Sequence, residues 1–309
     1  MKRVILSGAT GALGMALIQK CMEEQTEVLV LCRKNSHRSY QIPNNPFVKK
    51  IYADLADFAS LQNTTGKKWD VFYHLAWEGT TGESRNDTAL QMKNAASTLD
   101  AVYLAQRFGC TAFLGAGSQA EYGRTEGTLN AMTPTHPETG YGIAKLAAGQ
   151  MSRLLCRQLG MRHVWTRILS VYGPWDGKQS MVMTAIERFL KGERASFTAG
   201  EQQWDYLYSR DAADALYRLG QRGIDQKTYC LGSGQARPLK EYILKIRDAV
   251  APTAVAGIGE VPYAKGQVMY LCADIEELQK DTGFVPRVSF EEGIRETVEF
   301  VKNGQRTWR

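Results

Sequence analysis

A tyrosine and a lysine lie four residues apart in the segment ETGYGIAK, at Tyr141 and Lys145. The segment is typical of the first turn of a helix, on which residues four positions apart share a face. A phenol is a poor base at neutral pH because its ordinary pKa is about 10, and a neighbouring ammonium would lower that pKa by stabilising the phenolate. The pair could therefore move a proton to or from an oxygen atom. The spacing alone is not specific, since 14 tyrosines and 17 lysines in 309 residues give roughly 0.8 such pairs by chance.

A glycine-rich turn, SGATGALG, follows the first apolar run of the chain and opens the first helical segment. Glycine lets the chain turn tightly, lets the backbone approach a pyrophosphate and lets a helix pack closely on a strand. The unpaired N–H groups at the start of a helix also attract phosphate. We therefore predict a dinucleotide site rather than a merely structural turn, with contacts from Gly8, Thr10, Gly11, Ala12, Leu13 and Gly14.

The end of the second predicted strand bears on the choice of cofactor. An acidic residue there would bind the adenosine ribose of NAD, whereas an arginine accommodates the additional phosphate of NADP. Cys32 occupies this place, and Arg33, Lys34 and Arg38 follow it. The sequence favours NADP, with Arg33 as the phosphate contact. NAD stays open, because a solvated basic loop would have the same composition.

Short apolar runs alternate with longer helical segments in the first half of the chain. This alternation predicts an α/β fold, a Rossmann-like doubly wound parallel sheet that binds its ligands at the carboxyl ends of the strands. The predicted strands cover residues 3–8, 27–32, 69–76, 110–118 and 163–173. The predicted helices lie near residues 11–24, 88–108 and 141–159.

The pattern becomes irregular after Gly173. We expect a dinucleotide-binding domain over residues 1–172, rejoined by segments near 204–232, and a smaller substrate-binding region over residues 173–309. Further helices are predicted around residues 181–191 and 239–250, with two more near the C-terminus and a strand in the segment KTYCLGSG.

The composition is that of an ordinary soluble protein, with 44% hydrophobic and 23% charged residues. No apolar run approaches the ~20 residues that span a bilayer, and the glycine turn interrupts the N-terminal run, so we expect neither a membrane segment nor a signal peptide. The net charge of +6 is spread along the chain, which does not favour nucleic acid as a partner. Six scattered cysteines indicate reduced thiols in a cytoplasmic protein and no metal site.

These features together resemble the extended short-chain dehydrogenase/reductase family, in its nucleotide-sugar epimerase, dehydratase and reductase branch. The resemblance covers almost the whole chain and rests on the order of several motifs. After the glycine turn come ADLAD with Asp54 and Leu55, HLA at residues 74–76, Asn94 in NAASTLDAV, GSQAEYG with Ser118, YGIAK with Tyr141 and Lys145, and RILSVYGP at residues 167–174.

The resemblance implies a catalytic set of Ser118, Tyr141 and Lys145, in which the lysine also holds the nicotinamide ribose. It implies that Asp54 and Leu55 contact the adenine, although Asp54 could instead cap the following turn. Leu75 and Ala76 match the strand end beneath the cofactor, and Asn94 is expected to organise the active-site end of its helix. The alternatives are purely structural roles: Tyr141 could be a half-buried helix tyrosine, and Ser118 could be a strand-end cap. Members of the family often pair through the helices around Asn94 and Lys145, so a homodimer is plausible.

Several positions depart from the pattern of this branch. The 4,6-dehydratases carry an Asp-Glu pair directly after the serine or threonine, and Gln119 and Ala120 stand there instead, so dehydration is disfavoured. Glu121 lies one residue further and should point to the other side of an extended segment. Trp204 replaces an arginine that usually binds the diphosphate, Ala264 stands where a second arginine is common, and Ser170 replaces a frequent asparagine.

The leading hypothesis is a reductase that uses NADPH on a 4-keto hexose linked to a nucleotide. We expect Ser118, Gln119, Tyr141 and Ser170 to contact this substrate. A nucleotide-sugar 4-epimerase with a retained cofactor is the first alternative, and a non-catalytic dinucleotide-binding sensor or interaction protein is the second. In substrate, the chain resembles enzymes that make deoxyhexoses for surface polysaccharides.

Overall fold

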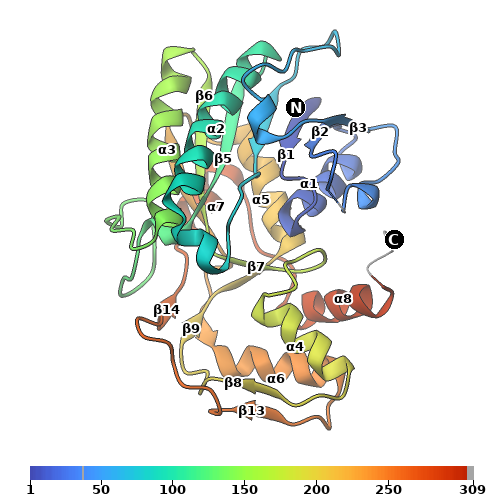
Figure 1. Cartoon of the computed structure of the whole chain (residues 1–309), viewed down its shortest axis with the longest axis vertical. Helices are drawn as coiled ribbons and strands as arrows, with labels where there is room; N and C mark the ends of the chain where they lie inside the picture. Colours follow the sequence, from blue (N-terminus) through green and yellow to red (C-terminus); the bar gives the residue numbers. More distant parts are fainter. Residues whose placement is uncertain (37, 305–309) are drawn as a thin grey trace.

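Seven parallel strands form the central sheet, in the order β11-β6-β5-β4-β1-β2-β3 (Figure 1). The computed structural model describes residues 1–36 and 38–304. Because the chain steps outward from β1 in both directions, the sheet is doubly wound, and the predicted fold class is confirmed. The strands are β1 (Arg3–Ser7), β2 (Glu27–Cys32), β3 (Val48–Tyr52), β4 (Val71–His74), β5 (Ala112–Ser118), β6 (Arg162–Ile168) and β11 (Lys227–Leu231).

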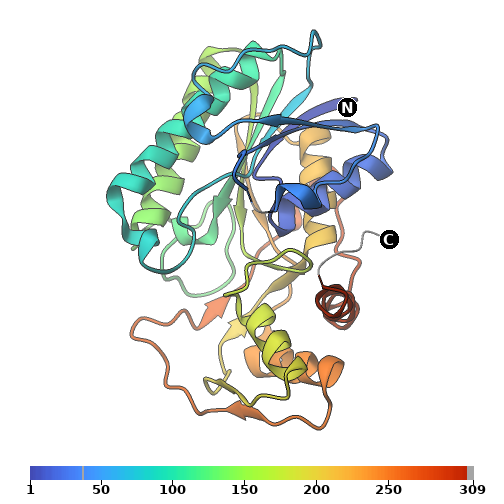
Figure 2. The ribbon, with the colours of Figure 1, turned by 45° about the vertical axis from the view of Figure 1, so that its right-hand side comes forward.

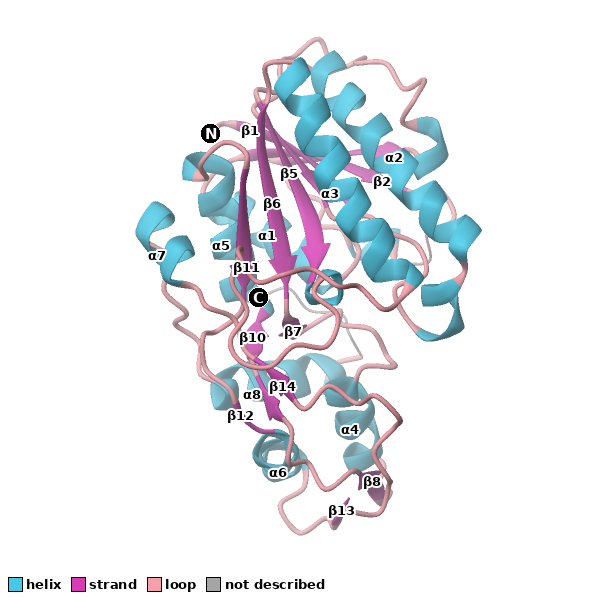
Figure 3. Cartoon of the chain, turned by 90° about the vertical axis from the view of Figure 1, so that its left-hand side faces the viewer, coloured by secondary structure: helices cyan, strands magenta, loops and turns pink. Residues whose placement is uncertain are grey.

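Helices cover both faces of this sheet (Figure 3). Helices α2 (Thr88–Arg107) and α3 (Gly140–Gln158) pack side by side on one face, and α1 (Ala12–Glu23), α5 (Ser209–Arg222) and α7 (Glu276–Thr282) lie on the other. The inner strands are almost wholly buried because both of their faces are covered; all seven residues of β5 and six of the seven of β6 are buried. Short 3₁₀ helices interrupt the connections: η1 (Ser39–Gln41), η2 (Leu55–Asp57), η3 (Gly82–Asn86) and η4 (Gln119–Glu121).

The smaller region lies beyond the carboxyl ends of the large sheet (Figure 2). Its core is an aromatic cluster in which Tyr172, Tyr206, Tyr242 and Phe290 pack at centroid distances of 4.6–5.9 Å. Its helices are α4 (Met181–Leu190), α6 (Leu239–Val250) and α8 (Phe290–Lys302), and its strands are β7 (Ser170–Tyr172), β8 (Ala195–Phe197), β9 (Gln203–Trp204), β10 (Tyr206–Tyr208), β12 (Arg237–Pro238), β13 (Ala256–Ile258) and β14 (Tyr270–Leu271).

The buried carboxylate of Asp205 joins three separate segments of this region. It accepts hydrogen bonds from the backbone N–H groups of Ser233, Gly234 and Ala273 at 2.7–3.1 Å, and from the Ser233 hydroxyl. Since a buried carboxylate is tolerated only when its oxygens are bonded, Asp205 fixes β9 and β10 to the loops after β11 and β14.

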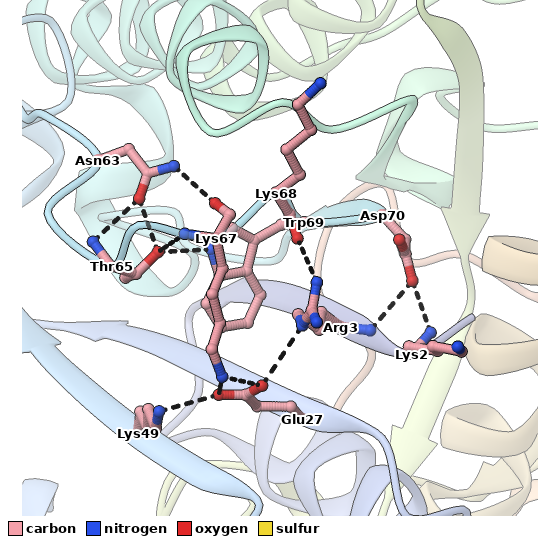
Figure 4. Close-up of polar contacts among 10 residues, drawn as sticks. All are labelled: Lys2, Arg3, Glu27, Lys49, Asn63, Thr65, Lys67, Lys68, Trp69 and Asp70. Carbon is pink, nitrogen blue, oxygen red and sulfur yellow. Dashed lines mark hydrogen bonds and ion pairs between the residues drawn. The ribbon is translucent and has the colours of Figure 1, made fainter.

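The amino ends of the strands carry a charged cluster at the edge opposite the ligand-binding edge (Figure 4). The Glu27 carboxylate forms ion pairs with Arg3, Lys49 and Lys67 at 3.5, 3.1 and 2.7 Å. Asp70 accepts the backbone N–H of Arg3 at 3.0 Å. These contacts hold the starts of β1, β2 and β3 together. They lie at the opposite edge of the sheet from the carboxyl ends of the strands, where such folds bind their ligands.

One strand of the large sheet and one of the helices that cover it were not predicted. Strand β3 has the sequence VKKIY, a half-exposed edge strand without an apolar run. Helix α5 lies in a stretch where the sequence pattern predicts irregular structure. Nine of its residues are buried against the sheet and α1. The predicted strand over residues 163–173 divides into β6 and β7, which belong to different sheets. Among the described helices, none is both long and apolar enough to cross a membrane.

Candidate active site

A cavity of about 280 Å³ opens at the carboxyl ends of β1, β2 and β4. This is where the order of the strands reverses, the usual ligand site of a doubly wound sheet. The residues predicted to bind the cofactor that do not line this cavity are Ala12, Leu13, Gly14, Tyr141 and Lys145. The predicted residues that do line it are Gly8, Thr10, Gly11, Arg33, Asp54, Leu55, Leu75 and Ala76.

The three glycines of the turn have different roles. Gly8 has a φ of +76°, and a Cβ there would lie 2.6 Å from backbone atoms of Leu75 and Ala76. A Cβ on Gly14 would lie 2.4 Å from the carbonyl oxygen of Gly8. Gly11, by contrast, is the N-cap of α1, and a Cβ there would meet no atom of the described chain within 4 Å. Gly8 and Gly14 therefore form the turn, whereas Gly11 leaves room beside the start of α1, where a pyrophosphate fits.

The basic residues after β2 lie at the far end of the cavity. Arg33 is exposed and lines both this cavity and an adjoining hollow that also contains Lys34, Asn35 and Ser36. The guanidinium of Arg38 is turned away, because it donates to the carbonyl oxygen of Trp175 at 3.2 Å. Arg33 is thus better placed than Arg38 to meet a phosphate.

Asp54 caps the following turn, which was the alternative to its expected contact with the adenine. Its carboxylate accepts the backbone N–H of Leu55 at 2.7 Å, and Asp57 accepts the N–H of Asp54 at 2.7 Å, which makes a capping box for η2. The same residue lines the cavity.

Ser118, Tyr141 and Lys145 come from neighbouring elements. Ser118 is the last residue of β5, and Tyr141 lies in the first turn of α3, where the side chain of the N-cap Thr139 accepts the N–H of Gly142. The exposed fractions of Ser118, Tyr141 and Lys145 are 9%, 9% and 4%. The Lys145 ammonium lies 5.8 Å from the centroid of the Tyr141 ring and donates to the carbonyl oxygen of Ala116 at 2.6 Å.

Burial sets the protonation of this pair. Desolvation lowers the pKa of Lys145 to about 7, and the charge of Glu121 opposes this change. The pKa of Tyr141 is raised, because desolvation outweighs the lowering contributions of the Ser118 hydroxyl and the Arg85 charge. The expectation that the ammonium would bring the pKa of Tyr141 down is therefore wrong for this site. The phenol favours its protonated form more than the sequence argument implied, whereas burial makes the Lys145 ammonium lose its proton more readily.

Ser118 also caps η4, which is the structural role given above as the alternative to catalysis. Its Oγ accepts the backbone N–H of Ala120 at 3.2 Å, and its own N–H donates to Glu121 at 2.8 Å. The cap and the interaction with Tyr141 coexist, because a hydroxyl oxygen has two lone pairs and one proton.

The expectation for Glu121 assumed an extended segment, but this residue lies in the 3₁₀ helix η4. It is fully buried and accepts hydrogen bonds from Arg167 Nε at 2.8 Å and from Trp165 Nε1 at 3.0 Å. A carboxylate held in this way is not free to exchange protons with a ligand. The two positions where a dehydratase has its acid and base hold only Gln119 and Ala120.

Trp204 and Ser170 form a hydrogen-bonded pair. The Trp204 indole Nε1 donates to Ser170 Oγ at 2.8 Å, and the ring packs on hydrophobic side chains of both regions. Trp204 and Ser170, which both differ from the residues usual in the family, thus bond to each other. The Ser170 hydroxyl keeps its own proton to donate to a ligand.

The loop after β4 contains site residues that the sequence argument missed. Trp77 lines the cavity, and its ring lies 3.8 Å from Lys145 Nζ and 6.0 Å from the Tyr141 ring. Arg85 lies over the Tyr141 ring at 4.4 Å. Asn94 holds this loop by bonding both the N–H and the carbonyl oxygen of Glu78. The signal that could have indicated Trp77 was its place directly after the HLA motif at a strand end.

Among the described residues, no group of three or more histidine, cysteine and acidic side chains is arranged to hold a metal ion.

Comparisons with known proteins are consistent with this geometry. The model of the NAD dependent epimerase/dehydratase family matches residues 4–232. A dTDP-glucose 4,6-dehydratase of Neisseria meningitidis serogroup B is 22% identical, over 100% of this chain and 96% of that protein. The UDP-N-acetylglucosamine 4-epimerase of Methanobrevibacter ruminantium M1, in complex with UDP-N-acetylmuramic acid, superposes with a TM-score of 0.88 at 21% identity, over 98% and 99% of the two chains. RMD of Pseudomonas aeruginosa, complexed with NADPH, gives a TM-score of 0.81 at 21% identity, over 96% and 99%.

The glycine turn allows a matched pair of variants. Gly14→Ala should lower the free energy of unfolding by about 1–3 kcal/mol, because its Cβ would overlap the backbone of the turn. Gly11→Ala should cost less than about 1 kcal/mol, the loss of a favourable N-cap residue, yet weaken NADPH binding because its methyl group enters the cavity. Urea unfolding and fluorescence titration with NADPH measure the two effects. Equal stability losses in the two variants would contradict the assigned roles.

Proposed function

Because the chain belongs to the NAD-dependent epimerase/dehydratase family, we propose that it is an oxidoreductase that reduces a 4-keto hexose carried on a nucleotide. One observation carries the proposal. A serine, a tyrosine and a lysine meet at the carboxyl edge of the sheet, beside the cavity that the glycine turn lines. Reduction of a ketone needs a proton for its oxygen, and these three side chains are suited to provide it.

When bound, the reduced nicotinamide supplies the hydride that the keto carbon accepts. Tyr141 donates its phenolic proton to the keto oxygen, so that the ketone becomes an alcohol. Ser118 hydrogen-bonds the same oxygen and orients it. Lys145 offsets the negative charge left on the Tyr141 oxygen. The raised pKa of Tyr141 keeps the phenol protonated at neutral pH, which is the form that reduction requires.

The proposed cofactor is NADP. Gly8, Thr10 and Gly11, with the start of α1, would hold its pyrophosphate. Arg33 would bind the additional phosphate, and Cys32 stands at the position of the acid that binds the ribose of NAD. Asp54 and Asp57 line the same hollow, where Arg33 and Lys34 offset their charge. Structurally similar proteins are complexed with NADPH or with NAD, so the choice rests on the residues after β2 alone.

The proposed substrate is a nucleotide-linked sugar. Similar proteins act on such compounds, among them a dTDP-glucose 4,6-dehydratase and a UDP-N-acetylglucosamine 4-epimerase. Gln119 and Ser170 are the proposed sugar contacts besides Ser118 and Tyr141. The dehydratase chemistry of some relatives is disfavoured, because Ala120 cannot carry a proton and Glu121 is held by Arg167.

A nucleotide-sugar 4-epimerase is the second candidate, supported by the likeness to an enzyme of that activity. The purified protein, incubated with a panel of 4-keto and 4-hydroxy nucleotide sugars, separates the two. A reductase consumes one NADPH for each 4-keto sugar, whereas an epimerase interconverts 4-hydroxy sugars with no net change in nicotinamide absorbance. Cofactor binding without either reaction would instead support a non-catalytic sensor.

Tyr141→Phe tests the proton donor. We expect kcat to fall by about 10²–10⁴-fold, the usual contribution of a general acid, while NADPH binding stays the same because the ring is retained. Steady-state kinetics and a binding titration provide the two readouts. An unchanged kcat would reject Tyr141 as the donor.

The proposed mechanism has a definite pH dependence. The pKa of Lys145 is about 7, below its ordinary value, so the ammonium is present at low pH and is lost as the pH rises through about 7. Reductive kcat/KM should therefore fall above neutrality. A profile that rises from pH 6 to pH 9 would contradict a role for the protonated lysine.

Arg33→Ala tests the choice of cofactor. It should weaken NADPH binding by about 1–3 kcal/mol, the value of a charge-assisted hydrogen bond, and leave NADH binding nearly unchanged. Arg38→Ala is the matched control, since that guanidinium is bonded to Trp175. Similar losses for NADPH and NADH in Arg33→Ala would contradict the assigned contact.

We further propose a homodimer that pairs through α2 and α3. Their outer face exposes five large hydrophobic side chains, each at least 42% accessible: Met92, Tyr103, Ile143, Met151 and Leu154. Met151→Glu should give a monomer by light scattering, whereas Val285→Glu, at a similarly exposed apolar residue outside this face, should not. A wild-type monomer at micromolar concentration would end this proposal.

A further inference from the structure

We propose that Trp77 is a positioning residue of the catalytic pair, whose indole holds the Lys145 ammonium and the Tyr141 ring in their working arrangement. The inference rests on the function proposed above, because it concerns the same pair. It adds a residue that neither the spacing of the tyrosine and lysine nor the glycine turn indicated.

One aromatic ring contacts both members of the pair. Lys145 Nζ lies 3.8 Å from the centroid of the Trp77 ring, within the range of a strong cation–π contact. The rings of Trp77 and Tyr141 meet at 6.0 Å with an interplanar angle of 85°, an edge-to-face arrangement. Because each contact is directional, the orientation of the indole restricts where the ammonium and the phenol can lie.

The Lys145 ammonium needs this support because it is buried. It has three N–H donors, and its one hydrogen bond to the described residues is to Ala116. The charged and titratable groups that face it are Glu121 from η4, His74 from β4 and Tyr141 from its own helix.

None of these groups replaces the indole. Glu121 favours the ammonium but is already paired with Arg167 at 2.8 Å. His74 is neutral, because burial and the nearby Lys145 lower its pKa to about 3. Arg85 lies over the Tyr141 ring and carries a charge of the same sign as the lysine. The electron-rich face of Trp77 is therefore a main source of stabilisation for the buried charge.

The orientation of Trp77 is itself fixed. Its Nε1 donates to Gln91 Oε1 at 2.8 Å, and the amide of Gln91 donates to the carbonyl oxygens of Gly79 and Ser84 at 2.9 Å. Gln91 lies on α2 and is 1% exposed. A side chain that merely filled space would not need a buried amide to set its rotation. Trp77 also lines the cavity, so it connects the cofactor site with the proton donor.

Three variants separate the ring face from its hydrogen bond. Trp77→Phe keeps an aromatic face and loses the N–H, Trp77→Leu loses both, and Gln91→Met removes the acceptor of the indole together with the amide that bonds Gly79 and Ser84. The pKa of Lys145 is measured in each by NMR of protein labelled with ¹³C at lysine Cε. The Lys145 signal is identified as the one absent from Lys145→Met, and circular dichroism melting verifies folding.

We expect Trp77→Leu to lower the pKa of Lys145 by about one pH unit, the equivalent of a desolvated cation–π contact. Trp77→Phe and Gln91→Met should lower it by less than half as much. In the kinetic arm, the fall of kcat/KM at alkaline pH should move to lower pH in Trp77→Leu. Equal pKa values in Trp77→Leu and wild type, or equal changes in Trp77→Leu and Trp77→Phe, would overturn the proposal.

The two arms keep this inference distinct from the proposed function. If the wild-type protein reduces none of the 4-keto nucleotide sugars, the proposed reductase activity fails. The NMR titration, which needs no substrate, still decides whether Trp77 holds Lys145.

Discussion

The burial of the Lys145 ammonium is the constraint around which the candidate site is arranged. A charge removed from water is costly unless nearby groups stabilise it, and Lys145 is 4% exposed. The carbonyl oxygen of Ala116, the face of Trp77 and the charge of Glu121 supply that stabilisation from three different elements. Their sum still leaves the pKa of Lys145 near 7, so small changes in its surroundings decide whether the ammonium is present at neutral pH.

Glu121 acts on both members of the catalytic pair in the direction that proton donation needs. Its charge raises the pKa of Lys145 and also raises that of Tyr141, so it favours an ammonium beside a protonated phenol. Arg167 compensates the buried carboxylate from the side away from the site. The pair between Glu121 and Arg167 therefore sets the local potential as well as joining η4 to β6, and it does so without exposing a carboxylate to a ligand.

The parts of this architecture that follow short-range rules could be predicted from the sequence. The glycine turn, the strands that are buried on both faces and the helix capped by Thr139 each carry a local signal. Each lies within two residues of its predicted place, except that the strand predicted over residues 163–173 ends at Ile168 in β6. Helix α5 had a local signal that was missed, since Ala212, Ala215, Leu216 and Leu219 recur at helical spacing. The edge strand β3 lacked one, because VKKIY is half polar. The role of Trp77 could not be read from a local signal either. Its partners Lys145 and Gln91 come from two different helices, and only the folded sheet brings them together.

The smaller region shows how recognition can change while the catalytic set stays in place. Trp204 and Ser170 stand where the resemblance predicts an arginine and an asparagine, and they bond to each other at 2.8 Å. The hydrogen bond gives the half-buried indole N–H an acceptor within the smaller region. Arg237 pairs with Trp204 across the antiparallel strands β12 and β9, so a cation is retained on the neighbouring strand of the same small sheet. Because β7 and β9 lie outside the large sheet, this exchange leaves the strand ends that carry Ser118 and the glycine turn unchanged. We therefore expect substitutions at Trp204 and Ser170 to alter the smaller region without displacing Ser118 or the glycine turn.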